Sequence, residues 1–362
     1  MNGSFEKKNA LVLGGYGAVG SAVCEELASI IDGRIVVAGR DLRQAQRLAL
    51  RLGERVEPAQ LDAAELARHP EILNRTSVVV NCVEANNFEV AKQCFAHSAH
   101  YVDISATIEI IEQLQTLQSE AERANATAAL SVGVAPGLTN LLARYAQSQL
   151  GPLAQVDLFV LLGLGEVHGE AAIQWTLRNL GRRFSILSDG IHKEVRPFGE
   201  GRSTRMPEPF GERTAYRFGF SDQRTLPATL GIKSAGSWLC FDSRLATGAL
   251  WLLANSRLLS IIPLWRLSWL IAKLSRWFAL GGAHFVVQAD ATSASGGKAR
   301  FALIGEGEAQ MTGIVAAHVV RRLLNGPAAP GILHIEQLLD LETLLPALDG
   351  RLRLAETSCS FT

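Results

Sequence analysis

The sequence is poor in cysteine and carries no excess of either charge, and each scarcity excludes a class of protein. The five cysteines among 362 residues form no Cys-x-x-Cys pair. We therefore expect no disulfide framework, and a reducing compartment fits best. The 35 basic and 35 acidic side chains give a formal net charge of +0. The chain thus has no global electrostatic reason to bind nucleic acid.

Signals for a metal ion, for a serine nucleophile and for secretion are also missing. The eight histidines are scattered, and no pair has helical ligand spacing with an acidic partner, so we expect no metal site. No Gly-x-Ser-x-Gly elbow occurs in the sequence. The first residues, Met1 to Lys8, are polar and charged, and no apolar leader follows them. We therefore expect no signal peptide and a cytoplasmic protein.

A glycine-rich turn near the N-terminus is the strongest functional signal. The apolar run Ala10–Leu13 predicts a buried strand, and the stretch from Ser21 to Ala28 predicts a helix. The glycines between them form Gly-x-Gly-x-x-Gly, which permits a tight turn, close approach of a pyrophosphate and close packing of helix on strand. The helix N-terminus also offers N–H groups to the anion. The predicted dinucleotide-binding residues of this turn are Gly15, Tyr16, Gly17, Ala18, Val19 and Gly20.

The end of the second predicted strand, 34–39, indicates which dinucleotide binds. An acidic residue there would hold the ribose 2′-hydroxyl of NAD. This sequence instead has Arg40, which suits the 2′-phosphate of NADP, with Arg43 as a second support. We therefore predict NADP rather than NAD. Asp41 is expected to cap the following helix, 42–52.

Further strands extend the predicted sheet. The third, 56–62, ends at Asp62, which either lies near the adenine or caps the helix that begins at Ala63. Three more strands are expected, at 77–83, 101–105 and 128–133. Because ligands bind outside the carboxyl ends of such strands, the end of the fourth strand should border the nicotinamide. The cofactor-binding residues predicted there are Asn81, Cys82 and Val83.

Candidates for proton transfer follow the same rule of strand ends. Glu84 comes directly after the fourth strand, and Asp103 and Ser105 lie at the end of the fifth. His168 lies in a glycine-flanked loop farther along the chain. We predict that the catalytic residues come from these four, although Asp103 could equally be a cap or a structural hydrogen-bonding partner, and His168 could be an ordinary loop histidine.

The order of motifs resembles the saccharopine dehydrogenase-like family. The matching stretches are Gly14–Gly20, Val37–Arg40, Val79–Cys82, His100–Ser105 and Gly133–Gly137, with looser matches at Trp175–Leu177, Gly305–Gly307 and Met311–Gly313. The resemblance implies a Rossmann domain with an inserted mixed-sheet domain that supplies much of the substrate site and often a dimer contact. It also implies hydride transfer between NADP(H) and an imine or secondary amine of an amino-acid-derived substrate.

One departure from the family pattern concerns the substrate. Members that form saccharopine usually carry Asp before the Pro-Gly after the sixth strand, and this sequence has Ala135 there. The departure weakens the case for saccharopine itself. Two alternatives stay open: reduction of a lipophilic carbonyl or enoyl group at a membrane surface, and a non-catalytic NADP-binding interaction protein.

The length and the motifs together predict an α/β protein with two domains. We expect a Rossmann-type parallel sheet over 1–145 and an α+β mixed-sheet domain over 146–310, and the resemblance implies that this second domain serves the substrate and dimerisation. By resemblance, the C-terminal stretch 311–362 should form helices that return to the first domain. The expected partners are a small-molecule substrate and a second copy of the chain.

A basic, tryptophan-rich stretch stands out within the second domain. The chain has no Asp or Glu from Ser243 through Ala289, and 243–280 holds four of its six tryptophans. Arg and Lys recur too closely for a transmembrane helix. The stretch predicts basic amphipathic helices that either pack on protein or make peripheral contact with a membrane.

Overall fold

The computed structural model describes residues 8–165, 170–256 and 281–357. The chain divides into two compact units, and each is described separately below. The first unit comprises Met1–Gly133 and Ala309–Leu339, and the second comprises Val134–Glu308 and Asp340–Thr362. Within the described residues, no helix combines the length and the apolar character needed to cross a membrane.

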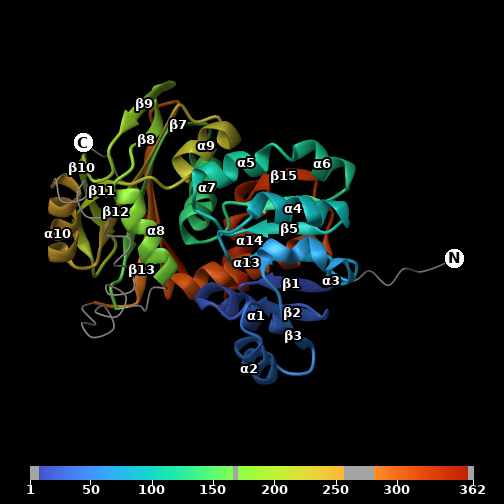
Figure 1. Cartoon of the computed structure of the whole chain (residues 1–362). Coiled ribbons are helices and arrows are strands. Elements are labelled where there is room, and N and C mark those ends of the chain that lie inside the picture. Colours follow the sequence, from blue (N-terminus) through green and yellow to red (C-terminus); the bar gives the residue numbers. More distant parts are fainter. Residues whose placement is uncertain (1–7, 166–169, 257–280, 358–362) are drawn as a thin grey trace. The chain divides into compact units, whose positions relative to one another are not determined.

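The first unit is built on a seven-stranded parallel sheet with the order β15-β6-β5-β4-β1-β2-β3 (Figure 1). The strands are β1 (Ala10–Leu13), β2 (Ile35–Gly39), β3 (Val56–Gln60), β4 (Val78–Asn81), β5 (His100–Asp103), β6 (Thr127–Leu130) and β15 (Gly331–His334). The central strands are short apolar runs that are buried on both faces, as parallel strands flanked by helices require.

Helices cover this sheet. They are α1 (Ala18–Ile30), α2 (Leu42–Leu52), α3 (Pro70–Leu73), α4 (Asn87–Ala96), α5 (Ile108–Gln115), α6 (Gln118–Arg123) and α13 (Glu308–Asn325), with the 3₁₀ turns η1 (Ala63–Arg68) and η4 (Ile335–Gln337). Apolar side chains of α4, α5 and η1 pack into one core with those of β1, β4 and β5. Helix α13 packs tightly on α1 at Gly313, where an added Cβ would lie 2.5 Å from the Cβ of Ala22.

The second unit is built on a seven-stranded mixed sheet with the order β10-β11-β12-β7-β13-β14-β16. Its strands are β7 (Leu153–Leu162), β10 (Gly201–Met206), β11 (Gly211–Arg217), β12 (Ser234–Phe241), β13 (His284–Ser293), β14 (Lys298–Glu306) and β16 (Leu352–Thr357). A separate hairpin joins β8 (Phe184–Ser188) and β9 (Ile191–Val195). The turn η2 (Val134–Leu138) and the helices α7 (Thr139–Leu150), α8 (Glu170–Leu180), α9 (Asp222–Leu230), α10 (Arg244–Asn255) and α14 (Leu341–Ala347) complete the unit.

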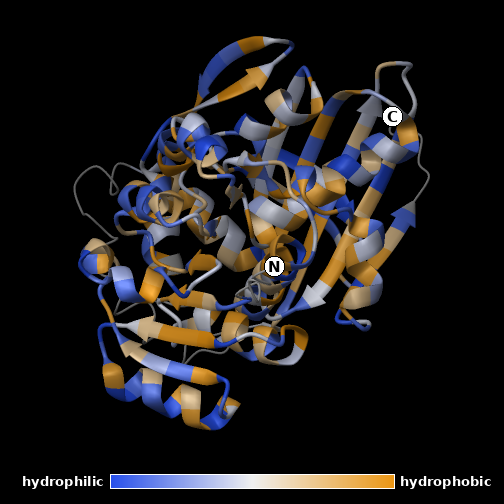
Figure 2. Ribbon diagram, turned by 90° about the vertical axis from the view of Figure 1, so that its right-hand side faces the viewer, coloured by the Kyte–Doolittle hydropathy of each residue, from blue (hydrophilic) through white to orange (hydrophobic). Residues whose placement is uncertain are grey.

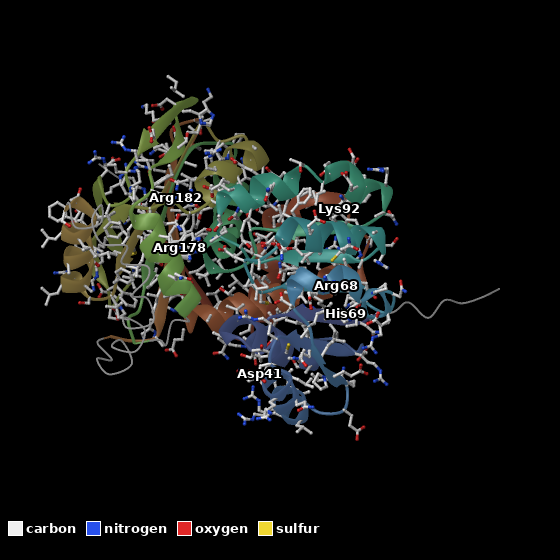
Figure 3. The ribbon with its side chains drawn as sticks, in the orientation of Figure 1. Asp41, Arg68, His69, Lys92, Arg178 and Arg182 are labelled. Atoms are coloured by element: carbon white, nitrogen blue, oxygen red, sulfur yellow. The ribbon has the colours of Figure 1, made fainter. Side chains whose placement is uncertain are left out.

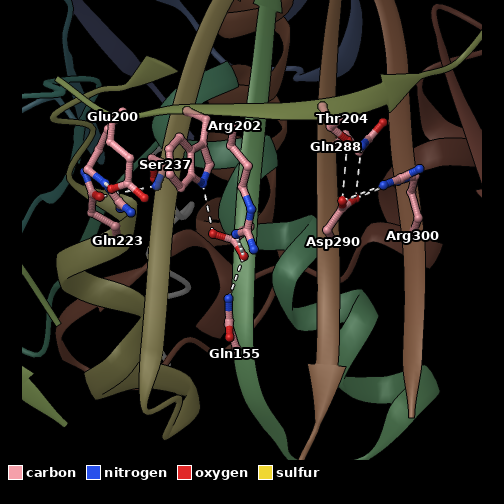
Figure 4. Close-up of polar contacts among 12 residues, drawn as sticks. Gln155, Glu200, Arg202, Thr204, Gln223, Ser237, Gln288, Asp290 and Arg300 are labelled. Carbon is pink, nitrogen blue, oxygen red and sulfur yellow. Dashed lines mark hydrogen bonds and ion pairs between the residues drawn. The ribbon is translucent and has the colours of Figure 1, made fainter. Parts of the chain in front are cut away.

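The mixed sheet curls so that β10 crosses one of its faces. The sheet order separates β10 from β13 by three strands. Even so, Gln288 of β13 donates to the Oγ1 of Thr204 on β10 at 2.8 Å (Figure 4). In the hydropathy view, strands of this sheet alternate between blue and orange, whereas the strands of the first unit are largely orange (Figure 2).

The predicted fold class, a Rossmann-type parallel sheet with a second mixed-sheet domain, is confirmed. The boundaries differ from those expected. The first unit's N-terminal segment ends at Gly133 rather than at residue 145, because α7 packs on β7, β13 and β14. The stretch 311–362 is not purely helical, and only part of it belongs to the first unit. It contains β15, which joins the first sheet, and β16, which pairs with β14 of the second.

Candidate cofactor and active site

The glycine turn links β1 to α1 and is held by backbone hydrogen bonds. The N–H of Gly15 donates to the carbonyl of Ala38 at 3.0 Å, and the N–H of Gly17 donates to that of Gly14 at 2.9 Å. A Cβ on Gly20 would lie 2.2 Å from the carbonyl oxygen of Gly14, so this position admits no side chain. The close packing predicted for the third glycine is therefore what the structure contains.

The N-terminus of α1 is suited to an anion. Gly17 is its N-cap residue and has no side chain that could accept from the first N–H groups of the helix. Gly17 and Ala18 are exposed, and a Cβ on Gly17 would meet only the carbonyl of Gly14, at 3.2 Å. The turn thus offers unfilled space and unsatisfied donors where the pyrophosphate of a dinucleotide would lie, and these residues fit that group.

Tyr16 connects the glycine turn to the end of β2. Its hydroxyl accepts from the backbone N–H of Asp41 at 2.9 Å. Its ring lies so close to Gly39 that a Cβ there would be 2.3 Å from the Tyr16 Cε1. Arg40 and Arg43 follow at the same strand end and are exposed. Two exposed arginines therefore follow the strand end that Tyr16 joins to the turn, and their guanidinium groups suit a ribose 2′-phosphate.

Both aspartates near this end act as caps. Asp41, labelled in Figure 3, accepts from the backbone N–H groups of Arg43 at 2.9 Å and Gln44 at 3.3 Å, which confirms its predicted role at the start of α2. Hydrogen bonds from Gln44 lower the pKa of Asp41. Asp62 accepts from the N–H of Ala64 at 3.0 Å and caps η1. Of its two predicted interpretations, the structure contains the cap, and contact with the adenine stays a prediction.

A buried hydrogen-bond network joins the carboxyl ends of β4 and β5. We call it the Asp103 network. Asp103 accepts from the side chains of Asn87 at 2.8 Å and Tyr101 at 2.5 Å, and from the backbone N–H of Ser105 at 2.8 Å. Asn87 also donates to the Ser105 hydroxyl at 3.0 Å, and Asn81 donates to that of Tyr101 at 3.1 Å. The network brings together three predicted site residues and two that were not predicted.

The network leaves little room for Asp103 to meet a substrate. Asp103 is 1% exposed, and its oxygens already accept three hydrogen bonds. Burial and the nearby Asp103 charge raise the pKa of Tyr101 well above its usual value. Tyr101 could have been found from the sequence, because residues two apart on a strand share a face. The place of Asn87 in the network could not be predicted in this way, because it depends on the residue at which α4 begins.

Glu84 is the accessible acid at this edge. It is exposed, and its Oε1 accepts from the hydroxyl of Thr107 at 3.0 Å. The pKa of Glu84 lies above its ordinary value, because neighbouring protein atoms partly desolvate the carboxylate and the charge of Asp103 adds to the effect. A raised pKa keeps more of the carboxyl protonated near neutral pH, which suits a proton donor.

The remaining residues after β4 line the glycine turn. Cys82 donates its N–H to the carbonyl of Leu13 at 3.0 Å, and burial followed by the Asp103 charge raises the pKa of its thiol to about 12. The N–H of Val83 donates to Asn81 Oδ1 at 3.3 Å. A Cβ on Gly14 would lie 2.7 Å from the Val83 side chain, so the end of β4 contacts the turn directly.

His168 lies outside the described residues. Within the part of the chain that is described, no group of three or more His, Cys, Asp or Glu side chains could hold a metal ion.

The second unit holds a charged cluster that the sequence alone did not predict. Asp157 on β7 accepts from the indole Nε1 of Trp238 at 2.9 Å and pairs with Arg202. The guanidinium of Arg217 lies 4.1 Å from the centroid of the same indole ring. Figure 4 shows this group beside a second pair, in which Arg300 donates to both oxygens of Asp290 at 2.7 and 2.6 Å.

Comparison with known families identifies the first unit. Residues 10–129 match the family described as the saccharopine dehydrogenase NADP binding domain. The resemblance noted in the sequence is thus confirmed, and NADP is confirmed as the cofactor of this domain. The match identifies an NAD(P)-dependent oxidoreductase.

Solved structures give the fold of the whole chain. An apo saccharopine dehydrogenase (L-Glu forming) from Saccharomyces cerevisiae is 15% identical, with a TM-score of 0.66 over 96% of this chain and 99% of that one. A DAP dehydrogenase of C. glutamicum in complex with DAP is 14% identical, with a TM-score of 0.48 over 96% of this chain and 99% of that one. The first likeness supports the two-unit fold, and the second is too weak to add to it.

Proposed function

We propose that this chain is an NADP(H)-dependent oxidoreductase that transfers hydride to or from a C–N bond of an amino-acid-derived substrate. The observation that carries the proposal is the joining of the glycine turn to the ends of β4 and β5, with Glu84 accessible at that edge. The family match of residues 10–129 and the yeast saccharopine dehydrogenase likeness favour an imine or secondary amine over other acceptors.

In the first unit, different residues bind the cofactor and transfer the proton. The glycine turn and the N-terminus of α1 hold the pyrophosphate, and Arg40 with Arg43 takes the 2′-phosphate. Bound NADPH supplies the hydride. Glu84 donates a proton to the nitrogen of the imine as its carbon is reduced, and it accepts that proton in the reverse direction.

The Asp103 network serves this chemistry indirectly. Its hydrogen bonds hold the loop after β5 and the start of α4 in place around the end of β4. Asp103 also adds the negative charge that helps raise the pKa of Glu84. We assign Asp103 and Ser105 as positioning residues, and Glu84 as the catalytic residue.

A substitution at Glu84 tests this assignment. In a screen that couples amino acids to 2-oxo acids, NADPH oxidation by Glu84→Gln should fall by about a hundredfold, with an unchanged Kd for NADPH. The matched control is Glu89→Gln, which removes an exposed acid from the first turn of α4. The imine-reducing rate should fall as the pH rises through the Glu84 pKa, because the protonated acid is the active form. Full turnover by Glu84→Gln would refute the role.

A specific observation keeps a second candidate function in view. Ala135, which replaces the acid of the saccharopine-forming pattern, packs against an apolar cluster that includes Val160 and Phe218. An apolar environment there suits a lipophilic carbonyl or enoyl substrate better than a second amino acid. The same screen, extended to acyl substrates, distinguishes the two. Oxidation of NADPH by neither class would favour a non-catalytic NADP-binding protein.

A further inference from the structure

Helix α10 exposes an apolar stripe on the surface of the second unit. Leu245 is 87% exposed and Leu252 is 64% exposed. Together with the exposed Ala249 they follow the spacing i, i+4, i+7, so they lie along one side of the helix. Trp251 stands at the margin of this stripe, 36% exposed and stacked on Tyr216 with 6.1 Å between the ring centroids. We call Leu245, Ala249 and Leu252 the α10 stripe.

The α10 stripe is not a by-product of a poorly packed helix. Thr247 is buried, and Leu250 and Ala254 pack against an aromatic cluster of the unit, so α10 already has a buried face. The other large apolar side chains exposed in the described part of the chain, Leu50 and Ile191, lie on different elements. The gathering of exposed leucines on one helix therefore marks a surface that contacts something apolar.

A basic pocket adjoins the stripe at the N-terminal end of α10. It has a volume of about 360 Å³, and its walls include Arg244 of α10 and Arg213 of β11. Arg244 donates to the backbone carbonyl of Glu212 at 3.0 Å. Arg213 donates from its two terminal nitrogens to the backbone carbonyls of Glu212 at 3.1 Å and Asp242 at 3.4 Å, while its buried Nε makes no hydrogen bond within the described residues. The two guanidinium groups outnumber Glu212, which is the acid on the pocket wall. Such a pocket favours an anionic group.

The sequence extends this positive character beyond the pocket. Helix α10 carries Arg244 and no acid, and no Asp or Glu occurs from Ser243 through Ala289. A partner protein would present its apolar surface with a mixed polar rim, whereas a lipid surface presents apolar chains beneath a layer of phosphates. An apolar stripe on an acid-free helix, beside a pocket with two arginines, is complementary to that layered chemistry.

We propose that the α10 stripe and its arginine pocket form a docking surface for an anionic lipid surface. Leu245 and Leu252 enter the boundary between headgroups and acyl chains, while Arg213 and Arg244 contact a phosphate. The proposal does not depend on the substrate, since it concerns where the second unit binds and not the reaction.

Vesicle flotation of the full chain tests the proposal. The wild type should float with vesicles of phosphatidylcholine and phosphatidylserine and remain behind with phosphatidylcholine alone. The double variant Leu245→Asp/Leu252→Asp should bind vesicles about tenfold more weakly or worse, because it removes the two leucines that the membrane would bury. The matched control is Ile191→Asp, an equally apolar residue that is 63% exposed on β9. Urea unfolding of each variant reports that the second unit is folded.

Substitutions of the two pocket arginines test the contribution of the pocket to vesicle binding. Arg213→Ala and Arg244→Ala should each weaken vesicle binding about fivefold. Inorganic phosphate as a competitor distinguishes a lipid headgroup from a free ion: binding of phosphate without any binding of vesicles would overturn the proposal. So would a wild type that stays behind with anionic vesicles, or a double variant that floats as well as the control. A stripe that instead holds two copies together would appear as a dimer that Leu245→Asp/Leu252→Asp dissociates without vesicle binding, which also overturns it.

Discussion

The Asp103 network and the charged cluster of the second unit lie in different parts of their sheets. In the first unit, Asp103, Tyr101 and Asn81 lie at or near the carboxyl ends of adjacent parallel strands. In the second unit, the charged cluster lies within the strands of the mixed sheet. There Asp157 and Asp290 stand directly opposite each other in an antiparallel pair.

The difference separates groups that can meet a ligand from groups that hold a shape. Two acids directly opposite each other repel, and each therefore needs its own arginine, supplied by Arg202 and Arg300. These ion pairs stabilise the curled sheet. At the edge of the first sheet, polar groups lie beside loops that a cofactor can approach. Substitutions at the glycine turn and strand ends of the first unit should therefore alter cofactor binding, and those in the charged cluster of the second unit should alter stability.

The largest effect is expected at Gly20. Gly20→Ala places a methyl group 2.2 Å from the carbonyl oxygen of Gly14. The turn cannot keep its shape, and NADPH affinity should fall by about a thousandfold or more, equivalent to roughly 4 kcal/mol. Gly17→Ala is the matched control, because its methyl group meets the same carbonyl at a tolerable 3.2 Å. It should keep the fold and weaken NADPH binding less. A fluorescence titration of NADPH measures both, and equal affinities would contradict the packing argument.

The next effect concerns the second unit. Asp290→Ala leaves Arg300 without its carboxylate partner in a site where both side chains are mostly buried, at 15% and 18% exposure. The free energy of unfolding should drop by about 3 kcal/mol. NADPH affinity should stay within about twofold of the wild type. Urea unfolding measures the first quantity. The double variant Asp290→Leu/Arg300→Met should recover most of the loss, since it removes both charges together.

Arg40 tests the cofactor preference of the first unit. Arg40→Ala should weaken NADPH about tenfold and leave NADH unchanged, because only NADPH carries the 2′-phosphate. Arg47→Ala, which removes another exposed arginine from α2, is the control and should change neither affinity. A loss shared equally by NADPH and NADH would assign Arg40 to general electrostatics instead.

The smallest effect is a pH dependence in the first unit. Burial lowers the pKa of His334, whose ring nitrogens lie 2.8 Å from the Ser131 hydroxyl and 3.0 Å from the Gln115 amide. The unfolded chain, with its higher histidine pKa of about 6.5, takes up the proton first as the pH falls. The stability that the neutral His334 contributes is therefore fully present above about pH 6.5. It is lost as the pH falls below that value, by up to about 1.4 kcal/mol per pH unit. His334→Gln should flatten this dependence in urea titrations, and an unchanged slope would contradict the burial argument.

The sequence predicted the first unit well because its information is local. A strand, a glycine turn and a helix follow one another within Ala10–Ile30, and each parallel strand ends at the same edge. The capping role of Asp41 was readable for the same reason. The charged cluster of the second unit was not, because the pairing of Asp157 with Arg202, and of Thr204 with Gln288, depends on how far the sheet curls. The spacing of residues along the sequence does not indicate how far the sheet curls.

The position of β15 has a consequence for how the protein is made. The strand that completes the first sheet comes from Gly331–His334, and the helix that packs on α1 comes from Glu308–Asn325. A ribosome must therefore translate the whole mixed sheet up to β14 before the N-terminal residues can acquire their last strand. Until then, β6 presents an unpaired edge to other nascent chains. During synthesis, the cofactor-binding half of this protein is the first to emerge, but it can complete its sheet only after most of the second unit has been made.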